Sequence, residues 1–523
     1  MIVLILQKNL SIIINFWYYS FWLIKANYKV VTSVSEGKMI EIYNKGLSEV
    51  MSVLIALTNE IKSLNSQVET LSKNNTGLSD RVKSLESQVN KNSNNSSKPP
   101  STDGFKKKTK SLRTKSGKSP GGQEGHKGAT LALSDNPDEV INHKVDKCDI
   151  CGESLQDVAP ERHIIRQIID IPEIEVKVIE HRAEVKKCPK CRRRNTAKFP
   201  DCVTNTVQYG DKVKAVAVYL TQYQLIPYKR GTELINDMFG IKLSQGRMVN
   251  FNKRCHDDLK PIEDNIKASI TNHTGAIHFD ETGIYIDKKR QWLHVASNDK
   301  YTYYQAHEKR GQIATDEINI LPNFAGTAVH DCFKTYNKYS KCEHALCNAH
   351  ILRELNAITE LEKQTWAEPM KSLLIDIKKE VDLTWNYANA VTLDKIEIFE
   401  NRYAQILEDG FKEDYIANSE TYAKKKVKKS TSLNLLNRLS GYNDRILAFM
   451  YDFDIPFDNN LAERDLRMTK VKQKISGTFR SVEGENAFTR IRGYVSTVRK
   501  NGLNTLNCIK SIFTLEPIDP TLV

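Results

Sequence analysis

The apolar residues of this chain first repeat in alternating steps of four and three. Over residues 57–89 Leu occupies one heptad position throughout, and β-branched residues occupy the other except at Asn75: Leu57, Ile61, Leu64, Val68, Leu71, Asn75, Leu78, Val82, Leu85 and Val89. This choice favours a parallel two-stranded coiled coil in which Asn75 fixes the register. A single amphipathic helix packed on its own domain is the alternative, but the unbroken heptads favour the coiled coil and hence a dimer.

A second pattern begins near residue 275, where the apolar residues follow the period of β-strands. It predicts three strands, a helix and a fourth strand at residues 276–286, 291–297, 301–307, 313–320 and 326–329. Three strands, a helix and a further strand form the opening of a ribonuclease-H-like α/β fold.

Residues 209–270 have a helical pattern. Residues 231–240 predict a short helix closed by glycine, and Ser244 caps a second helix that starts at Gln245. Such a pair resembles a DNA-reading helix-turn-helix, but ordinary packing of two helices is the favoured interpretation. Further helices predict an insertion at about residues 351–450, with segments at 366–386, 394–407 and 431–447.

Four of the ten cysteines form two C-x-x-C pairs: Cys148, Cys151, Cys188 and Cys191. Paired thiolates on two tight turns supply the tetrahedral sulfur set that zinc prefers. The intervening residues 166–172 and 175–180 are rich in β-forming residues, so we expect a zinc ribbon with structural Zn²⁺. A redox pair is the alternative, and the cysteine usage suits a reducing cytosol.

The chain has 523 residues and a formal charge of +13, so we expect several domains and a polyanionic partner. Residues 105–119 hold seven basic residues and no acid, between a polar turn-forming segment and a glycine-rich one. This flexible linker is expected to order on a phosphate backbone, and a solvated linker is the alternative. The residues expected to contact DNA here are Lys106, Lys107, Lys108 and Arg113.

Residues 1–24 are strongly apolar and are interrupted by Lys8 and Asn9. They approach the length that spans a bilayer, but they have no basic leading region and no small-residue cleavage site. The leading hypothesis is an over-extended start with the working chain beginning near Met39. A membrane anchor and a buried helix are the alternatives.

Three carboxylates are candidates for a metal centre. Asp280 and Asp331 end apolar β-like runs, and Glu463 lies among Arg464, Arg467 and three lysines. A carboxylate inside a sheet is costly unless it binds a metal or is paired, and Mg²⁺ or Mn²⁺ prefers oxygen ligands. These acids therefore predict a two-metal site for phosphoryl transfer. Spacing alone leaves three substitutes: Asp287, Asp299 and Asp458.

Two further groups of residues have side chains that suit a binding site. Arg464 and Arg467 lie one helical turn apart and suit DNA phosphates, with pairing to Asp465 or Glu463 as the alternative. Four other residues have zinc-ligand types: Cys342, His344, Cys347 and His350. A core strand that runs into a helix is the favoured interpretation of that segment.

Several motifs together resemble the insertion sequence 66 family of bacterial DDE transposases. They are His278-Phe-Asp-Glu-Thr-Gly283, Asp331-x-x-x-x-Tyr336, Cys347-Asn-Ala-His350, Asp458-Asn-Asn-Leu-Ala-Glu-Arg-Asp-Leu-Arg467 and Lys474-Ile-Ser-Gly-Thr-Phe-Arg-Ser481. The resemblance runs from about Met39 to the end. It implies a catalytic triad of Asp280, Asp331 and Glu463, although Cys332 and Phe333 replace an expected glycine and tyrosine.

The expected fold class is multidomain α+β. The expected domains are an apolar extension (1–38), a coiled coil (39–92), a basic linker (93–135), a zinc ribbon (136–203), a helical domain (204–272), a ribonuclease-H-like core with a helical insertion (273–498) and a C-terminal element (499–523).

The expected function is that of an insertion-sequence transposase that binds element ends and catalyses metal-dependent strand cleavage and transfer. Its expected partners are DNA, further copies of the chain and helper proteins of the same element. The expected location is the bacterial cytoplasm at the nucleoid. A non-catalytic DNA-binding dimer with a decayed core and a related ribonuclease-H-fold nuclease are the alternatives.

Overall fold

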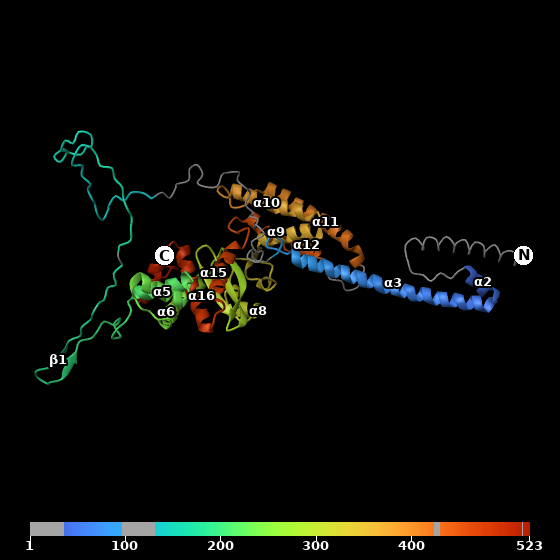
Figure 1. Ribbon diagram of the computed structural model, residues 1–523, viewed down its shortest axis with the longest axis horizontal. Coiled ribbons are helices and arrows are strands. Elements are labelled where there is room, and N and C mark those ends of the chain that lie inside the picture. The colour runs from blue at the N-terminus through green and yellow to red at the C-terminus, as the bar shows by residue number, and fades with distance from the viewer. Residues whose placement is uncertain (1–35, 97–130, 173, 423–428, 515, 523) are drawn as a thin grey trace. The chain divides into compact units, whose positions relative to one another are not determined.

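The computed structural model describes residues 36–96, 131–172, 174–422, 429–514 and 516–522 (Figure 1). The chain divides into two compact units, Met1–Asn90 and Lys91–Val523. The apolar segment 1–24 and the basic run 105–119 lie outside the described residues. None of the described helices combines the length and the apolar character needed to cross a lipid bilayer.

The described residues of the first unit form the helices α2 (Glu36–Asn44) and α3 (Leu47–Asn90). The predicted heptad residues lie on α3, where the large apolar ones are at least half exposed: Ile61, Leu64, Val68, Leu71, Leu78, Val82, Leu85 and Val89. The sequence pattern thus produces a long helix whose apolar stripe is not covered by the described part of its own chain.

The second unit is built on a five-stranded sheet of order β5-β4-β3-β6-β7. The strands are β3 (Ala276–Ile286), β4 (Lys289–Ser297), β5 (Thr302–His307), β6 (Thr327–His330) and β7 (Glu343–Leu346). β3, β4 and β5 pair antiparallel, whereas β6 and β7 run parallel to β3. The four predicted strands are confirmed, and β7 is the predicted core strand that runs into a helix.

Alternate residues of β3 face opposite sides of the sheet because strand side chains have a period of two. Ile277 and Phe279 belong to one core cluster, which also contains residues of α7 (Lys260–Thr271), α8 (Gln312–Ile318) and α16 (Val482–Lys500). Ile284 and Ile286 belong to another, which contains residues of α15 (Asn460–Ser476). Asp280 has the parity of Ile284, so it lies on the face that α15 covers.

The helical region before the sheet contains α4 (Asp211–Val218), α5 (Tyr228–Phe239) and α6 (Gln245–Asp258). Gly240 ends α5 in the left-handed conformation, and the Ser244 hydroxyl accepts a hydrogen bond from the amide of Arg247, as predicted. Met248 and Phe251 of α6 are buried in the main core. The second helix of this pair therefore has one face committed to packing.

The helices of the insertion follow β7. They are α9 (Asn348–Ala357), α10 (Ala367–Thr384), α11 (Leu393–Tyr422), α12 (Thr431–Gly441), α13 (Asn443–Ile446) and α14 (Ala448–Tyr451). They share a separate core cluster that includes Leu355, Leu374 and Leu436. After α15 and α16, the short α17 (Thr505–Phe513) packs its buried Ile509 and Ile512 into the main core.

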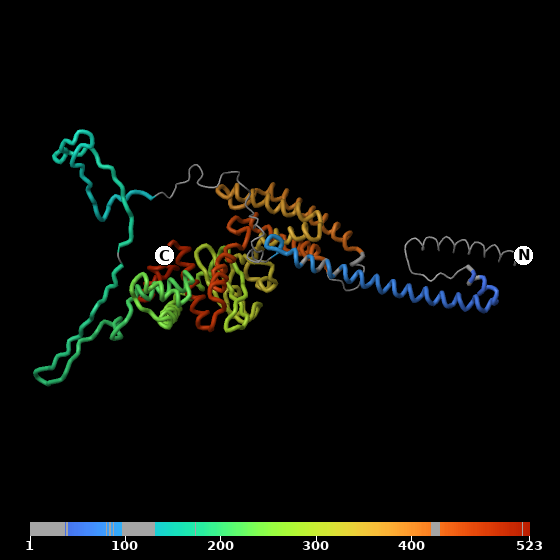
Figure 2. Tube along the Cα trace, viewed as in Figure 1, coloured from blue at the N-terminus to red at the C-terminus, as the bar shows by residue number. Residues whose placement is uncertain are grey.

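Figure 2 traces the segment between the cysteine pairs, whose strands differ from the prediction. The described residues of 166–180 form no strand, and the short strands are instead β1 (Val185–Lys187) and β2 (Arg194–Thr196). Ile168 and Val178 are 94% and 88% exposed. The β-forming residues have no second apolar layer against which to pack, so their local preference does not produce a sheet.

Candidate active site

The sheet register brings two of the predicted acids level with each other. His278 of β3 pairs with Val329 of β6 in parallel register. Asp280 lies two residues after His278, and Asp331 lies two residues after Val329, directly beyond the end of β6. Because parallel neighbours lie side by side, these two carboxylates start from adjacent backbone positions.

The third predicted acid, Glu463, lies in the first turn of α15. Ala462 and Leu466 of this helix pack in one apolar cluster with Ile284 of β3 and Leu293 of β4. This packing holds the helix against the sheet face that carries Asp280.

Asn459, the residue before α15, ties the helix to the sheet. Its side-chain Oδ1 accepts from Nδ1–H of His278 at 2.8 Å, and its Nδ2 donates to the carbonyl of Phe279 at 2.8 Å. Its backbone N–H donates to Sγ of Cys347 at 3.1 Å. Asn459 is 1% exposed, so these hydrogen bonds are shielded from water.

The electrostatics of Asp280 reflect a concentration of negative charge. Burial is the largest cause that raises its pKa well above the usual range, and the nearby charges of Glu281, Asp331 and Glu463 raise it further. The backbone N–H of Glu281 donates to its Oδ1 at 2.8 Å and opposes the shift. Among the described residues no basic side chain forms an ion pair with Asp280 or Asp331. A divalent cation would relieve this repulsion, so the carboxylates fit Mg²⁺ or Mn²⁺.

Glu281 occupies the other side of β3 and is held there by its own partners. Arg310 places Nη2 2.6 Å from Oε1, and the hydroxyl of Tyr336 donates to Oε2. Tyr336 is the last residue of the D-x-x-x-x-Y motif, whose first residue is Asp331. The spacing of this motif therefore has a structural explanation: it lets Tyr336, in the chain after β6, reach Glu281, the residue next to Asp280.

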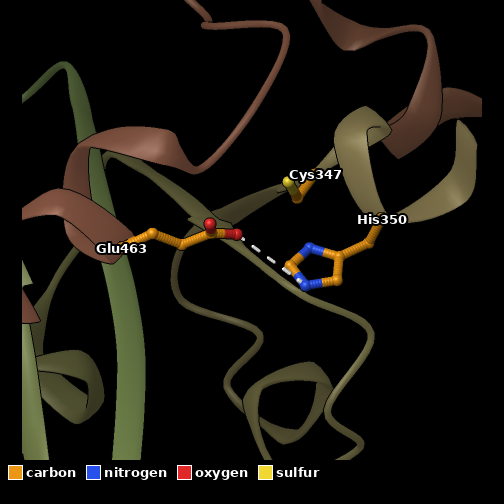
Figure 3. Close-up of side chains that lie close together, drawn as sticks. All are labelled: Cys347, His350 and Glu463. Atoms are coloured by element: carbon orange, nitrogen blue, oxygen red, sulfur yellow. Dashed lines mark ion pairs between the residues drawn. The ribbon is translucent and has the colours of Figure 1, made fainter. Parts of the chain in front are cut away.

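A cluster of different chemistry adjoins Glu463. One ligand atom each from Cys347, His350 and Glu463 lies within 4.8 Å of the others (Figure 3). Nε2 of His350 is 3.8 Å from Oε1 of Glu463, and Nη2 of Arg353 is 3.7 Å from the same oxygen. Burial raises the pKa of the Cys347 thiol to about 12 and, with Arg353, lowers the pKa of His350.

The four residues of zinc-ligand type in this segment separate into two groups. Cys347 and His350 lie at the start of α9, whereas His344 belongs to β7 and Cys342 directly precedes that strand. His344 is hydrogen-bonded to Nε2 of His330 at 2.9 Å and to the carbonyl of Tyr339 at 2.8 Å. The favoured interpretation of this segment, a strand running into a helix, is therefore confirmed.

Arg464 and Arg467 are exposed on α15. Among the described residues neither arginine forms an ion pair with Asp465 or Glu463, and Asp465 pairs instead with Lys500 at 2.8 Å. Both residues are thus exposed on the helix that carries Glu463. Lys106, Lys107, Lys108 and Arg113 lie outside the described residues.

The two C-x-x-C pairs form matching turns. The N–H of Gly152 donates to the carbonyl of Cys148 at 3.0 Å, and the N–H of Arg192 donates to that of Cys188 at 2.9 Å. Gly152 and Arg192 have φ values of 75° and 57°. Two turns of the same left-handed form suit a pair of thiolate ligands.

Backbone N–H groups prepare these thiols for a metal. The backbone of Cys151 lowers the pKa of Cys148, and the backbone of Cys191 lowers that of Cys188. A stabilised thiolate is the form that binds Zn²⁺, so both turns fit the ion. Among the described residues the four cysteines do not make a group with three ligand atoms within 4.8 Å.

Two residues of this site received no role from the sequence. Glu281 lies in the motif His278–Gly283 and Asn459 in the motif Asp458–Arg467. Their place in these motifs was the one sign in the sequence that they contribute to the site. Their roles depend on partners from distant parts of the chain, which no local pattern reveals.

Comparisons with known proteins match three stretches of the chain. Residues 206–487, more than half of it, match the family described as "Transposase IS66 family". Residues 146–192 match the "zinc-finger binding domain of transposase IS66", and residues 52–132 match a "family of unknown function (DUF6444)".

A curated relative also matches. The "Uncharacterized protein y4jO" of Sinorhizobium fredii is 40% identical over 70 residues, which cover 13% of this chain and 22% of the relative. The match thus spans less than a quarter of that protein.

Proposed function

Because this chain belongs to the transposase IS66 family, we propose that it is a DDE-type transposase of an insertion sequence. In this proposal it binds the ends of the element in the bacterial cytoplasm and catalyses metal-dependent cleavage and transfer of DNA strands. Helper proteins of the same element are further proposed partners.

The observation that carries the proposal is the uncompensated negative charge at the sheet. Asp280 and Asp331 stand level on adjacent strands, and Glu463 raises the pKa of Asp280 from the covering helix. The sheet order, with an antiparallel trio extended by two parallel strands, supports a ribonuclease-H-like core.

The three carboxylates would hold two Mg²⁺ or Mn²⁺ ions. Such ions activate the attacking water or 3′-hydroxyl and stabilise the leaving oxygen of the phosphodiester. The chain itself contributes orientation. Asn459 fixes α15 against β3, and Arg310 and Tyr336 hold the side chain of Glu281 on the opposite face of the strand.

DNA binding would use several parts of the molecule. Arg464 and Arg467 present guanidinium groups beside the acids, where each matches the geometry of a phosphate. The zinc-finger domain and the basic run 105–119 would hold the element ends. In addition, the apolar stripe of α3 would pair two chains as a coiled coil, with Asn75 at the interface.

The test is an assay of the full chain with Mg²⁺ on duplexes that carry the genomic sequences flanking its gene. The expected result is a nick at the element end followed by a joined product. Asp280→Asn is expected to lower the nicking rate at least about 1000-fold, because several kcal/mol of metal stabilisation are lost.

Asp454→Asn, an exposed aspartate in the loop before α15, is the matched control and should nick normally. Binding without any nicking would support the non-catalytic dimer. Nicking without joined products would support the ribonuclease-H-fold nuclease. Either outcome would overturn the transposase proposal.

A further inference from the structure

Cys347, His350 and Glu463 converge from two elements that the sequence separates widely. Cys347 is the residue between β7 and α9, His350 lies in the first turn of α9, and Glu463 lies in the first turn of α15. Figure 3 shows the imidazole of His350 directed at the carboxylate, with the sulfur of Cys347 beside both. Their ligand atoms lie within 4.8 Å of one another.

The sheet register explains why the sulfur is there. His330 of β6 pairs with Leu346 of β7, so the residues that follow, Asp331 and Cys347, are level. The thiol therefore continues the row of metal-ligand types that begins with Asp280. The three-residue spacing from Cys347 to His350 returns the imidazole to the same side of the helix start.

Two polar atoms of this cluster are buried without a hydrogen-bond partner among the described residues. They are Nδ1 of His350 and Oε1 of Glu463. An unsatisfied buried polar atom costs about 1–3 kcal/mol, so two of them side by side call for an explanation. Arg353 does not remove the need, because its nitrogen stays 3.7 Å from Oε1.

We propose that Cys347, His350 and Glu463 form a second zinc-class binding site, separate from the C-x-x-C turns. A thiolate, an imidazole and a carboxylate are the three ligand types that Zn²⁺ takes, and a water or substrate atom fills the fourth position. The thiol proton is released to solvent when the ion binds. The backbone N–H of Asn459 then supports the sulfur with a hydrogen bond, as at many zinc thiolates.

The ligand chemistry separates this site from the proposed magnesium centre. Mg²⁺ is a hard ion that prefers oxygen, whereas sulfur and imidazole select softer ions such as Zn²⁺. Glu463 belongs to both sets. When Zn²⁺ holds this carboxylate, one ligand is withdrawn from the magnesium centre, so zinc is expected to inhibit strand cleavage. This second consequence rests on the proposed function, whereas the binding site itself does not.

The binding test is the zinc content of the purified full chain after equilibration with a small excess of Zn²⁺ and gel filtration. Elemental analysis is expected to show two ions per chain. Cys347→Ser and His350→Asn are each expected to remove one ion. Cys148→Ser is expected to remove the other ion while leaving the proposed one in place.

Cys508→Ala is the matched control, because Cys508 is also buried but lies outside the cluster. It should keep both ions. A single ion in the unaltered chain that Cys148→Ser removes and Cys347→Ser retains would overturn the proposal. Unchanged content in both Cys347→Ser and His350→Asn would overturn it as well.

The inhibition test compares the nicking rate in Mg²⁺ with and without added Zn²⁺ for each protein. The zinc concentration for half inhibition is expected to rise at least about tenfold in Cys347→Ser. Loss of a residue that only orients a ligand already costs about tenfold in metal affinity, and Cys347 is proposed as a ligand itself. If half inhibition needs the same zinc concentration in the unaltered protein and in Cys347→Ser, the proposed inhibition through this site is overturned. If no protein nicks DNA, the proposed function fails, and the measured zinc content still decides the binding site.

Discussion

Oδ1 of Asn459 lies 2.8 Å from Nδ1 of His278, although 181 residues separate them in sequence. The same amide donates to the carbonyl of Phe279, the residue before Asp280. The start of α15 is therefore attached to β3 directly beside the first predicted catalytic acid. This contact sets where Glu463 approaches the sheet.

Replacement of Asn459 by alanine is expected to destabilise the core. It removes two buried hydrogen bonds and leaves the Phe279 carbonyl and His278 unpaired, at about 1–3 kcal/mol for each unsatisfied group. Thermal unfolding followed by circular dichroism should show a lower Tm for the transition of the second unit. Asn460→Ala is the control, because Asn460 is exposed and bonds only to Asp458 in the contacts described. Equal melting of both variants would contradict this role.

Glu485 is expected to make stability depend on pH. It is 1% exposed on α16, and burial raises its pKa from 4.5 to about 8. The folded state therefore holds a proton that the unfolded chain releases, so stability falls as pH rises through this window. Glu485→Gln should weaken the dependence, and its Tm should exceed that of the unaltered protein by more at pH 8 than at pH 5.

Glu483 provides the control for this experiment. It lies in the same first turn of α16 but is exposed. Glu483→Gln should keep the pH dependence of the unaltered protein. A Glu485→Gln variant with the original pH dependence would show that another group causes it.

The stripe on α3 is expected to be a dimer interface. Leu71 is 66% exposed on the single helix, and burying it between two chains would contribute about 1.5–3 kcal/mol per chain. Leu71→Lys should shift the population from dimer to monomer in light scattering. Ser72→Lys introduces the same charge on an adjacent exposed position and should remain dimeric. A dimer that survives Leu71→Lys must form elsewhere.

Arg464 and Arg467 are expected to bind phosphate groups. Each lost phosphate contact lowers the slope of log affinity against log salt by about 0.9 on duplex DNA. Arg464→Ala and Arg467→Ala should each show this reduction in binding titrations at several salt concentrations. Arg402→Ala is the control, because Arg402 pairs with Asp376 in the insertion. A slope unchanged in both test variants would place the DNA path away from α15.

Local patterns determined a large part of this molecule. Strand periodicity located β3 to β6. Gly240 marked the end of α5, Ser244 marked the start of α6, and the heptad repeat predicted the long helix α3. The C-x-x-C spacing predicted the two similar turns at Cys148 and Cys188. Each of these depends on residues close in sequence, whose preferences act within one element. The motifs around Asp280 and Glu463 also indicated the family.

Tertiary structure alone decided the rest. The described residues of 166–180, between the cysteine pairs, form no strand because no second apolar layer among the described residues covers them. The level positions of Asp280 and Asp331 come from pairing of β3 with β6, and the attachment of α15 comes from Asn459. The cluster at Cys347, His350 and Glu463 needs two helix starts to meet at one sheet edge. Such contacts join residues far apart in sequence, so only the packed chain brings their atoms together.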